Sequence, residues 1–186
     1  GKDHPDYAMS LNNIAMVYSN LGNYNESLEY NLIALKTYEK AIGKEHPSYA
    51  ISLNNIASNY FSLGDYNKSL EYNLIALQTY EKALGKKHPE YATSLNNIAV
   101  NYASLGDYKK SLEYNLIALE IKEKTLGKEH PDYALSLNNI AANYSALGDY
   151  KKSLEYNLIA LEIYEKALGK EHPDYATSLN NIAMDY

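Results

Sequence analysis

The chain has 186 residues, 46% of them hydrophobic, with a formal net charge of −6 and no cysteine. This acidic balance argues against nucleic acid as a partner, because sustained phosphate contact needs clustered lysine and arginine. No apolar run approaches the roughly 18 residues that cross a membrane, and without cysteine there is neither a disulfide framework nor a thiol nucleophile. We expect a cytoplasmic protein that binds neither nucleic acid nor membrane.

An internal repeat of 42 residues dominates the chain. The motif Ser-Leu-Asn-Asn-Ile-Ala begins at Ser10, Ser52, Ser94, Ser136 and Ser178, so successive copies start 42 residues apart. A fixed period of this size is typical of a solenoid, in which each unit buries its apolar face against its neighbours. We predict one array over 1–186, with repeats 1–42, 43–84, 85–126 and 127–168 and a partial repeat 169–186. The chain opens in phase with the repeat, without a signal-peptide pattern, and stops within a repeat, so we expect a piece of a longer array.

Each repeat predicts two helices. The first, over about 5–21, opens with His4-Pro5, where proline suits the first helical turn. The second, over about 24–42, follows Asn23, and Asp takes this capping place in later repeats. Glycines at 22 and 43 suit the left-handed residue that ends a helix. The same pattern predicts helices over about 47–63, 66–84, 89–105, 108–126, 131–147 and 150–168, and a ninth from about 173.

A helical wheel separates two faces on the first helix of the repeat. Its packing face comprises Tyr7, Leu11, Ile14, Tyr18 and Leu21. The opposite, mostly amide face comprises Met9, Asn12, Asn13, Met16 and Asn20. The second helix carries a core stripe of Tyr24, Leu28, Asn31, Leu35, Tyr38 and Ile42, flanked by the small residues Ser27, Ala34 and Ala41. Small residues allow neighbouring helices to pack at the close end of about 8–10 Å.

The repeat resembles a known family. The residues that carry the resemblance to the tetratricopeptide repeat are Leu11, Ile14, Ala15, Tyr18, Gly22, Tyr24, Ser27 and Ala34, with Leu for the usual Trp and Ser for the usual Ala. The longer connection between repeats makes the chain most similar to the 42-residue variety found in kinesin light chains. The resemblance covers every residue and implies an all-α, right-handed superhelical solenoid of antiparallel helix pairs, four repeats plus one extra helix. It also implies a non-enzymatic interaction scaffold whose concave groove, lined by the first helix of each repeat, binds a peptide or partner protein.

Differences between the copies gather on one helix face. Repeats 85–126 and 127–168 differ at eight positions: Lys87/Glu129, Glu90/Asp132, Thr93/Leu135, Val100/Ala142, Ala103/Ser145, Ser104/Ala146, Lys122/Tyr164 and Thr125/Ala167. Five of these lie on the first helix, on the side of the Met9 face, which suggests a surface tuned for contact. We therefore assign the partner-binding groove to Met9, Asn12, Asn13, Met16, Ile51, Asn54, Asn55, Ser58, Phe61, Thr93, Asn96, Asn97, Val100, Leu135, Asn138, Asn139 and Ala142.

The repeated Asn pairs permit two interpretations. Their amides could pair with the backbone of an extended ligand, or one Asn of each pair could satisfy polar groups between helices or repeats. Both remain open from the sequence. For the second-helix residues Asn31, Asn73, Asn115 and Asn157 we expect hydrogen bonds across the helix pair, because an unpaired buried amide costs about 1–3 kcal/mol.

We expect no metal site, no cofactor and no enzymatic activity. The histidines recur once per repeat before a proline, at His4, His46, His88, His130 and His172. Stacked repeats lie about 8–10 Å apart, whereas zinc needs nitrogens at about 2 Å, so capping or solvent contact is the expected role. A repeated residue also gives many equal sites rather than one catalytic constellation.

The charge of the first helices indicates the ligand class. Over 5–21, 47–63, 89–105 and 131–147 they carry no basic residue, so we expect a neutral or basic segment rather than the acidic ligands common in similar arrays. We also expect head-to-tail self-association through the ends of the array. The rival hypotheses are a self-assembling structural array without a specific ligand, and a sensor segment of a larger signalling protein.

Overall fold

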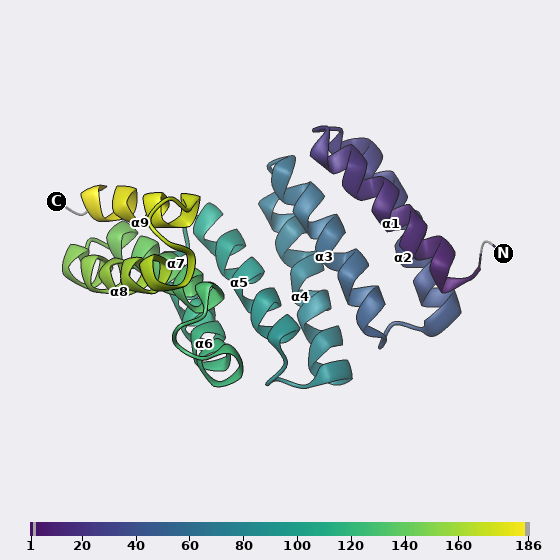
Figure 1. Cartoon of the computed structure of the whole chain (residues 1–186). Coiled ribbons are helices and arrows are strands. Elements are labelled where there is room, and N and C mark those ends of the chain that lie inside the picture. The colour runs from purple at the N-terminus through teal and green to yellow at the C-terminus, as the bar shows by residue number, and fades with distance from the viewer. Residues whose placement is uncertain (2, 185–186) are drawn as a thin grey trace. The chain divides into compact units, whose positions relative to one another are not determined.

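The computed structural model describes residue 1 and residues 3–184, and this part of the chain contains nine α-helices and no strand (Figure 1). The helices are α1 (Pro5–Asn20), α2 (Tyr24–Ile42), α3 (Pro47–Ser62), α4 (Tyr66–Leu84), α5 (Pro89–Ser104), α6 (Tyr108–Leu126), α7 (Pro131–Ala146), α8 (Tyr150–Leu168) and α9 (Pro173–Met184). The predicted all-α class is confirmed, and the predicted bounds agree with the observed helices to within one residue wherever both ends were predicted.

Histidine caps start the odd-numbered helices. His46 has an extended backbone, φ −84° and ψ 140°, and its Nδ1 accepts a hydrogen bond from the Ser48 backbone N–H at 3.1 Å. The same contact, at 3.1–3.2 Å, recurs at His4, His88, His130 and His172. A first-turn N–H has no partner within its own helix, so this bond stabilises the helix start. The capping role predicted for the histidines is confirmed.

The even-numbered helices start at an aspartate in three of four cases. The carboxylates of Asp65, Asp107 and Asp149 accept hydrogen bonds from backbone N–H groups three residues later, at 3.1–3.2 Å. These bonds are the main reason that the pKa of each carboxyl lies below its usual range. Asn23 is the N-cap residue of α2 as predicted, but its side chain makes no cap hydrogen bond.

A glycine in a conformation closed to other residues ends each even-numbered helix. Gly43, for example, has φ 83° and ψ 168° after α2. This region of backbone space is essentially restricted to glycine, because a side chain would clash with the backbone. The chain can therefore leave the helix sharply and extend into the next histidine cap.

The helices form two compact units. Residues 1–86 contain α1 to α4, and the second unit, from Lys87, contains α5 to α9. In the first unit α2 packs against α1 and α3, and α3 packs against α4. In the second unit each helix from α6 to α8 packs against the helices before and after it. Contacts between α1 and α3, and between α7 and α9, bring first helices of successive repeats together on one side of each unit.

Alanines and aromatic residues form the core of each helix pair. In the second unit Ala134, Ala160 and Tyr164 are at most 1% exposed and pack with Tyr133 and Leu137. The predicted packing face holds in α3, where Ile56 is fully buried, whereas its counterpart Ile14 in α1 is 41% exposed. The reason is that α3 packs against a preceding helix, α2. Leu21 is 68% exposed because it follows the last residue of α1, so its place on the packing face was wrong.

Candidate binding groove

The first Asn of the repeated pair links one repeat to the next. The Asn12 amide donates to the Ser52 hydroxyl at 2.9 Å, and Asn138 donates to Ser178 at the same distance. Asn96 makes the equivalent bond to Ser136 at 3.4 Å. These three asparagines are only 7–9% exposed. The structure therefore supports the inter-repeat interpretation for them, while Asn54 is half-buried.

The second Asn of each pair lies nearer to solvent. Asn13 is exposed, and Asn55, Asn97 and Asn139 are half-buried. Their side-chain amides form no hydrogen bond within the part of the chain that the structure describes, whereas the backbone carbonyls of Asn97 and Asn139 accept from residues one turn later. The first Asn of three pairs thus bonds to the next repeat, whereas the amide of the second Asn is available to a ligand.

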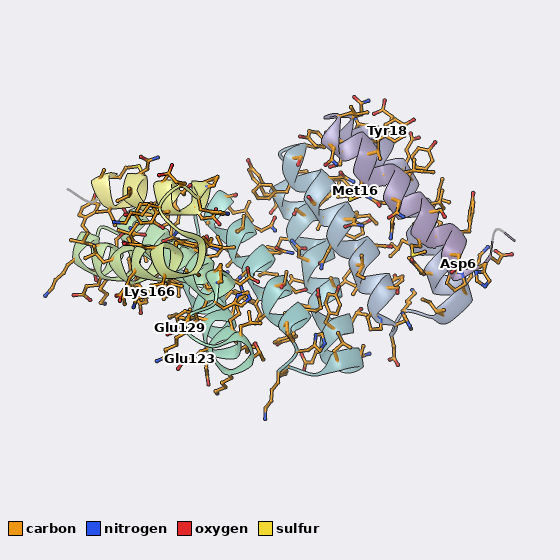
Figure 2. The ribbon with its side chains drawn as sticks, in the orientation of Figure 1. Asp6, Met16, Tyr18, Glu123, Glu129 and Lys166 are labelled. Atoms are coloured by element: carbon orange, nitrogen blue, oxygen red, sulfur yellow. The ribbon has the colours of Figure 1, made fainter. Side chains whose placement is uncertain are left out.

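A cavity of about 480 Å³ lies between α1, α2 and α3 in the first unit. Seven residues assigned to the groove line it: Met9, Asn12, Asn13, Met16, Ile51, Asn55 and Ser58. Met16 projects from α1 on the side of α3 (Figure 2). From α2, Ser27 and Asn31 also line the cavity, and their Oγ and Oδ1 atoms are buried without a hydrogen-bond partner among the described residues. The walls thus combine amide, hydroxyl and thioether groups with the apolar side chain of Ile51.

The second-helix asparagines correct one prediction. Asn31, Asn73, Asn115 and Asn157 are buried as expected, at 2–3% exposure. The predicted bond across the helix pair is wrong for Asn31, Asn73 and Asn115, whose Oδ1 atoms are buried without a hydrogen-bond partner among the described residues. The Asn157 amide donates to Ser153, one turn earlier in the same helix, at 3.4 Å. In the first unit Asn31 lines the crevice between successive repeats.

The variable groove positions are mostly exposed. Met9, Met16, Ile51, Val100 and Leu135 are 41–58% exposed. Ser58, Thr93 and Ala142 are exposed as well. Phe61 differs, since it is half-buried and its ring lies 5.0 Å from that of Tyr66 at the start of α4. Each unit therefore presents small and apolar side chains beside the available amides.

The second unit has an equivalent cavity of about 430 Å³ between α7, α8 and α9. Ala142, Ser153, Asn157 and Asn181 line it. Ser153 and Asn157 correspond, three repeats later, to Ser27 and Asn31 of the first cavity. The crevice between repeats is thus a recurring site rather than a feature of one repeat.

Lys122, one of the eight positions at which repeats 85–126 and 127–168 differ, is buried in the second unit. It stands on α6 where the other repeats have Tyr38, Tyr80 and Tyr164, and Tyr38 lines the first cavity. Lys122 is only 5% exposed, and its ammonium donates to the Ser136 hydroxyl at 3.0 Å and the Asp132 backbone carbonyl at 3.2 Å. The sequence could have indicated a special role for Lys122, because the other three repeats have tyrosine at this position of the second helix.

The described residues hold no cluster of histidine, aspartate or glutamate side chains that could bind a metal ion. None of the described helices is both long and apolar enough to span a bilayer.

Comparisons with known proteins agree with the helix pairing. Four overlapping segments, residues 6–73, 53–124, 102–158 and 138–186, match the sequence profile of the tetratricopeptide repeat. No curated protein sequence matches the chain significantly. A solved kinesin-light-chain-like protein of Podosopora anserina with nearly identical TPR-like repeats is 27% identical, with a TM-score of 0.84 over 98% of this chain and 87% of that one.

Two further solved structures share the fold at lower identity. BtubC (BKLC) from P. vanneervenii is 20% identical, with a TM-score of 0.87 over 98% of this chain and 72% of that one. The apo form of RapI is 22% identical, with a TM-score of 0.74 over 92% of this chain and 45% of that one. The profile matches together extend from residue 6 to residue 186. The chain belongs to the tetratricopeptide repeat family.

Proposed function

We propose that this chain is a non-enzymatic scaffold that holds a peptide or a segment of a partner protein against the first helices of its repeats. The observation that carries the proposal is the 480 Å³ cavity of the first unit, lined by seven residues selected from the sequence as a binding surface. Tetratricopeptide repeats commonly serve as protein-interaction scaffolds, which supports the same class of function.

The wall chemistry indicates a neutral or basic ligand. Asn13 and Asn55 each offer a donor and an acceptor to the backbone of an extended segment. Met9 and Met16 are flexible and polarisable, so they suit apolar side chains of varied shape. No lysine or arginine lies on α1 or α3, so an acidic ligand would find no charge-assisted partner there.

A charge-scanned peptide array tests this proposal. We expect capture of neutral and basic peptides, with little dependence on salt for the neutral ones. Asn13→Ala and Asn55→Ala should each weaken binding roughly two- to twelvefold, the cost of one net hydrogen bond. Asn67→Ala is the matched control, because Asn67 is an exposed α4 residue outside the cavity. Selective capture of acidic peptides, undiminished in both groove variants, would contradict the ligand class and the site.

Self-association is a second candidate function, favoured by the apolar face of α1. Ile14 and Val17 are 41% and 56% exposed, although the residue that corresponds to Ile14 in α3 is fully buried. A second copy of the chain could cover this face with a head-to-tail contact that repeats without closing. The copies would then assemble in the way that repeats stack within one unit.

A further inference from the structure

Three repeats share a lysine placed over a stacked tyrosine pair. Tyr60 and Tyr72 stack with ring centroids 5.6 Å apart, and the Lys68 ammonium lies 5.0 Å from the Tyr60 centroid. The pairs Tyr102–Tyr114 and Tyr144–Tyr156 stack at 5.5–5.6 Å, with Lys110 and Lys152 at 5.1 and 4.9 Å from the first ring of each pair. Each lysine also pairs with the capping aspartate of its helix, at 3.1–3.2 Å. An ammonium thus contacts an aromatic ring and a carboxylate in every one of these repeats.

The first repeat keeps the tyrosine stack but lacks the lysine. Tyr18 and Tyr30 stack at 5.4 Å with an interplanar angle of only 13°. Tyr18, labelled in Figure 2, lies near the C-terminal end of α1. Glu26 occupies the position of Lys68, eight residues after the first tyrosine, and Asn23 replaces the capping aspartate. No cation–π contact involves Tyr18 in the described part of the chain, so this ring has no ammonium of its own.

The charge around the Tyr18–Tyr30 stack favours a cation. Residues 18–30 include two acidic side chains, Glu26 and Glu29, and no basic one. The corresponding stretch 102–114 carries two acidic and two basic side chains. Glu26 is exposed, whereas both tyrosines are half-buried, so the rings are held in place while the carboxylate remains accessible.

We propose that Tyr18, Tyr30 and Glu26 form a binding site for a lysine or arginine side chain of a bound protein segment. The incoming cation would make the two contacts that Lys68, Lys110 and Lys152 make within the chain, one to the electron-rich ring face and one to a carboxylate. None of the three residues lines the cavity between α1, α2 and α3. The site is therefore separate from the proposed groove, and its occupancy does not depend on groove binding.

A titration of the whole chain with N-acetyl-lysine-methylamide, followed through the tyrosine ring signals by NMR, tests the site. We expect a saturable shift of the Tyr18 and Tyr30 rings, with Tyr60, Tyr102 and Tyr144 as internal controls because lysines already lie over them. The Nε-acetylated form, which lacks the charge, should bind about two- to fivefold more weakly or not at all. No shift at Tyr18, or equal shifts at all four tyrosine pairs, would overturn the proposal.

Two double variants that exchange these residues between repeats provide a second test. Asn23→Asp with Glu26→Lys introduces the aspartate and lysine that the later repeats have at these positions. It should therefore preserve the fold and abolish the Tyr18 response. The reverse exchange, Asp65→Asn with Lys68→Glu, should give Tyr60 a response that the parent chain lacks. Asn13→Ala with Asn55→Ala should leave the Tyr18 response unchanged, even if the groove proposal fails. A Tyr18 response that survives Glu26→Lys, or that disappears in the groove variant, would overturn the site.

Discussion

Two polar side chains and one backbone carbonyl contact the Ser136 hydroxyl in the second unit. Lys122 and Asn96 donate to this oxygen at 3.0 and 3.4 Å, and Ser136 itself donates to the Asp132 carbonyl at 3.3 Å. Both acceptors of Lys122 are uncharged, so its ammonium is buried without a carboxylate in direct contact. Burial therefore lowers the pKa of Lys122, and the negative charge of Asp132 opposes this effect only in part.

Lys122→Tyr should stabilise the chain. Tyrosine at this position is 1–6% exposed in the other three repeats, so the surrounding core accepts it. Ser136 keeps Asn96 and Asp132 as partners after the change, and no buried polar group loses its only partner. We expect the free energy of unfolding to rise by about 1–3 kcal/mol, measured by urea denaturation. A destabilised variant would mean that the Lys122 bonds to Ser136 and Asp132 outweigh the cost of burying its charge.

The stability of the chain should also depend on pH through Lys122. Its folded-state pKa lies below the ordinary value of 10.5, so between these two values the unfolded chain binds a proton that the folded chain has released. The free energy of unfolding contributed by this group therefore increases with pH across the window and is lowest below it. Lys122→Met removes the group without adding a tyrosine. In denaturation experiments from pH 7 to 10.5, the excess of the variant's free energy of unfolding over that of the parent chain should shrink as pH rises. A difference that stays constant with pH would contradict this reasoning.

Individual helices begin and end through contacts between residues two to five positions apart. The histidine caps reach two residues forward, and the Gly43 N–H bonds to the Tyr38 carbonyl five residues back. Both partners of such a contact lie within a few residues of each other, so the local sequence specifies where a helix can begin and end. This explains why the bounds of α2, α4, α6 and α8 could be predicted without knowledge of the packing.

Removing a histidine cap should weaken the helix that it starts. His46→Ala deletes the acceptor for the Ser48 N–H, so we expect a loss of about 0.5–2 kcal/mol in the free energy of unfolding. His46→Asn retains a side-chain acceptor at an extended cap residue and should stay within about 0.5 kcal/mol of the parent. Thermal melts of the two variants distinguish capping from loss of side-chain packing. Equal losses in both would show that packing is the main contribution.

At the scale of the whole molecule, the α1 face predicts concentration-dependent assembly. Static light scattering should give an apparent mass that rises with concentration, and Ile14→Glu should suppress the rise, because the carboxylate would be buried in the contact. Ile33→Glu is the control, since Ile33 and its counterpart Ile75 in the next repeat are both exposed, at 48% and 39%. A monomer at every concentration, or equal effects of the two substitutions, would rule out assembly through this face.

The repeat period, the helix positions and the fold class could all be predicted from the sequence alone, because they depend on periodicity and on local caps. The roles of Asn12 and Asn13 could not, since a helical wheel places both on the same face. Ser52 of the next repeat contacts Asn12 and leaves Asn13 free, and only the stacking of one repeat on another produces that contact. Lys122 shows the same dependence, because its acceptors lie on α7, 10 and 14 residues further along the chain. Local interactions determine where helices form, whereas the offset between stacked repeats decides which of two adjacent side chains is buried and which remains available to bind.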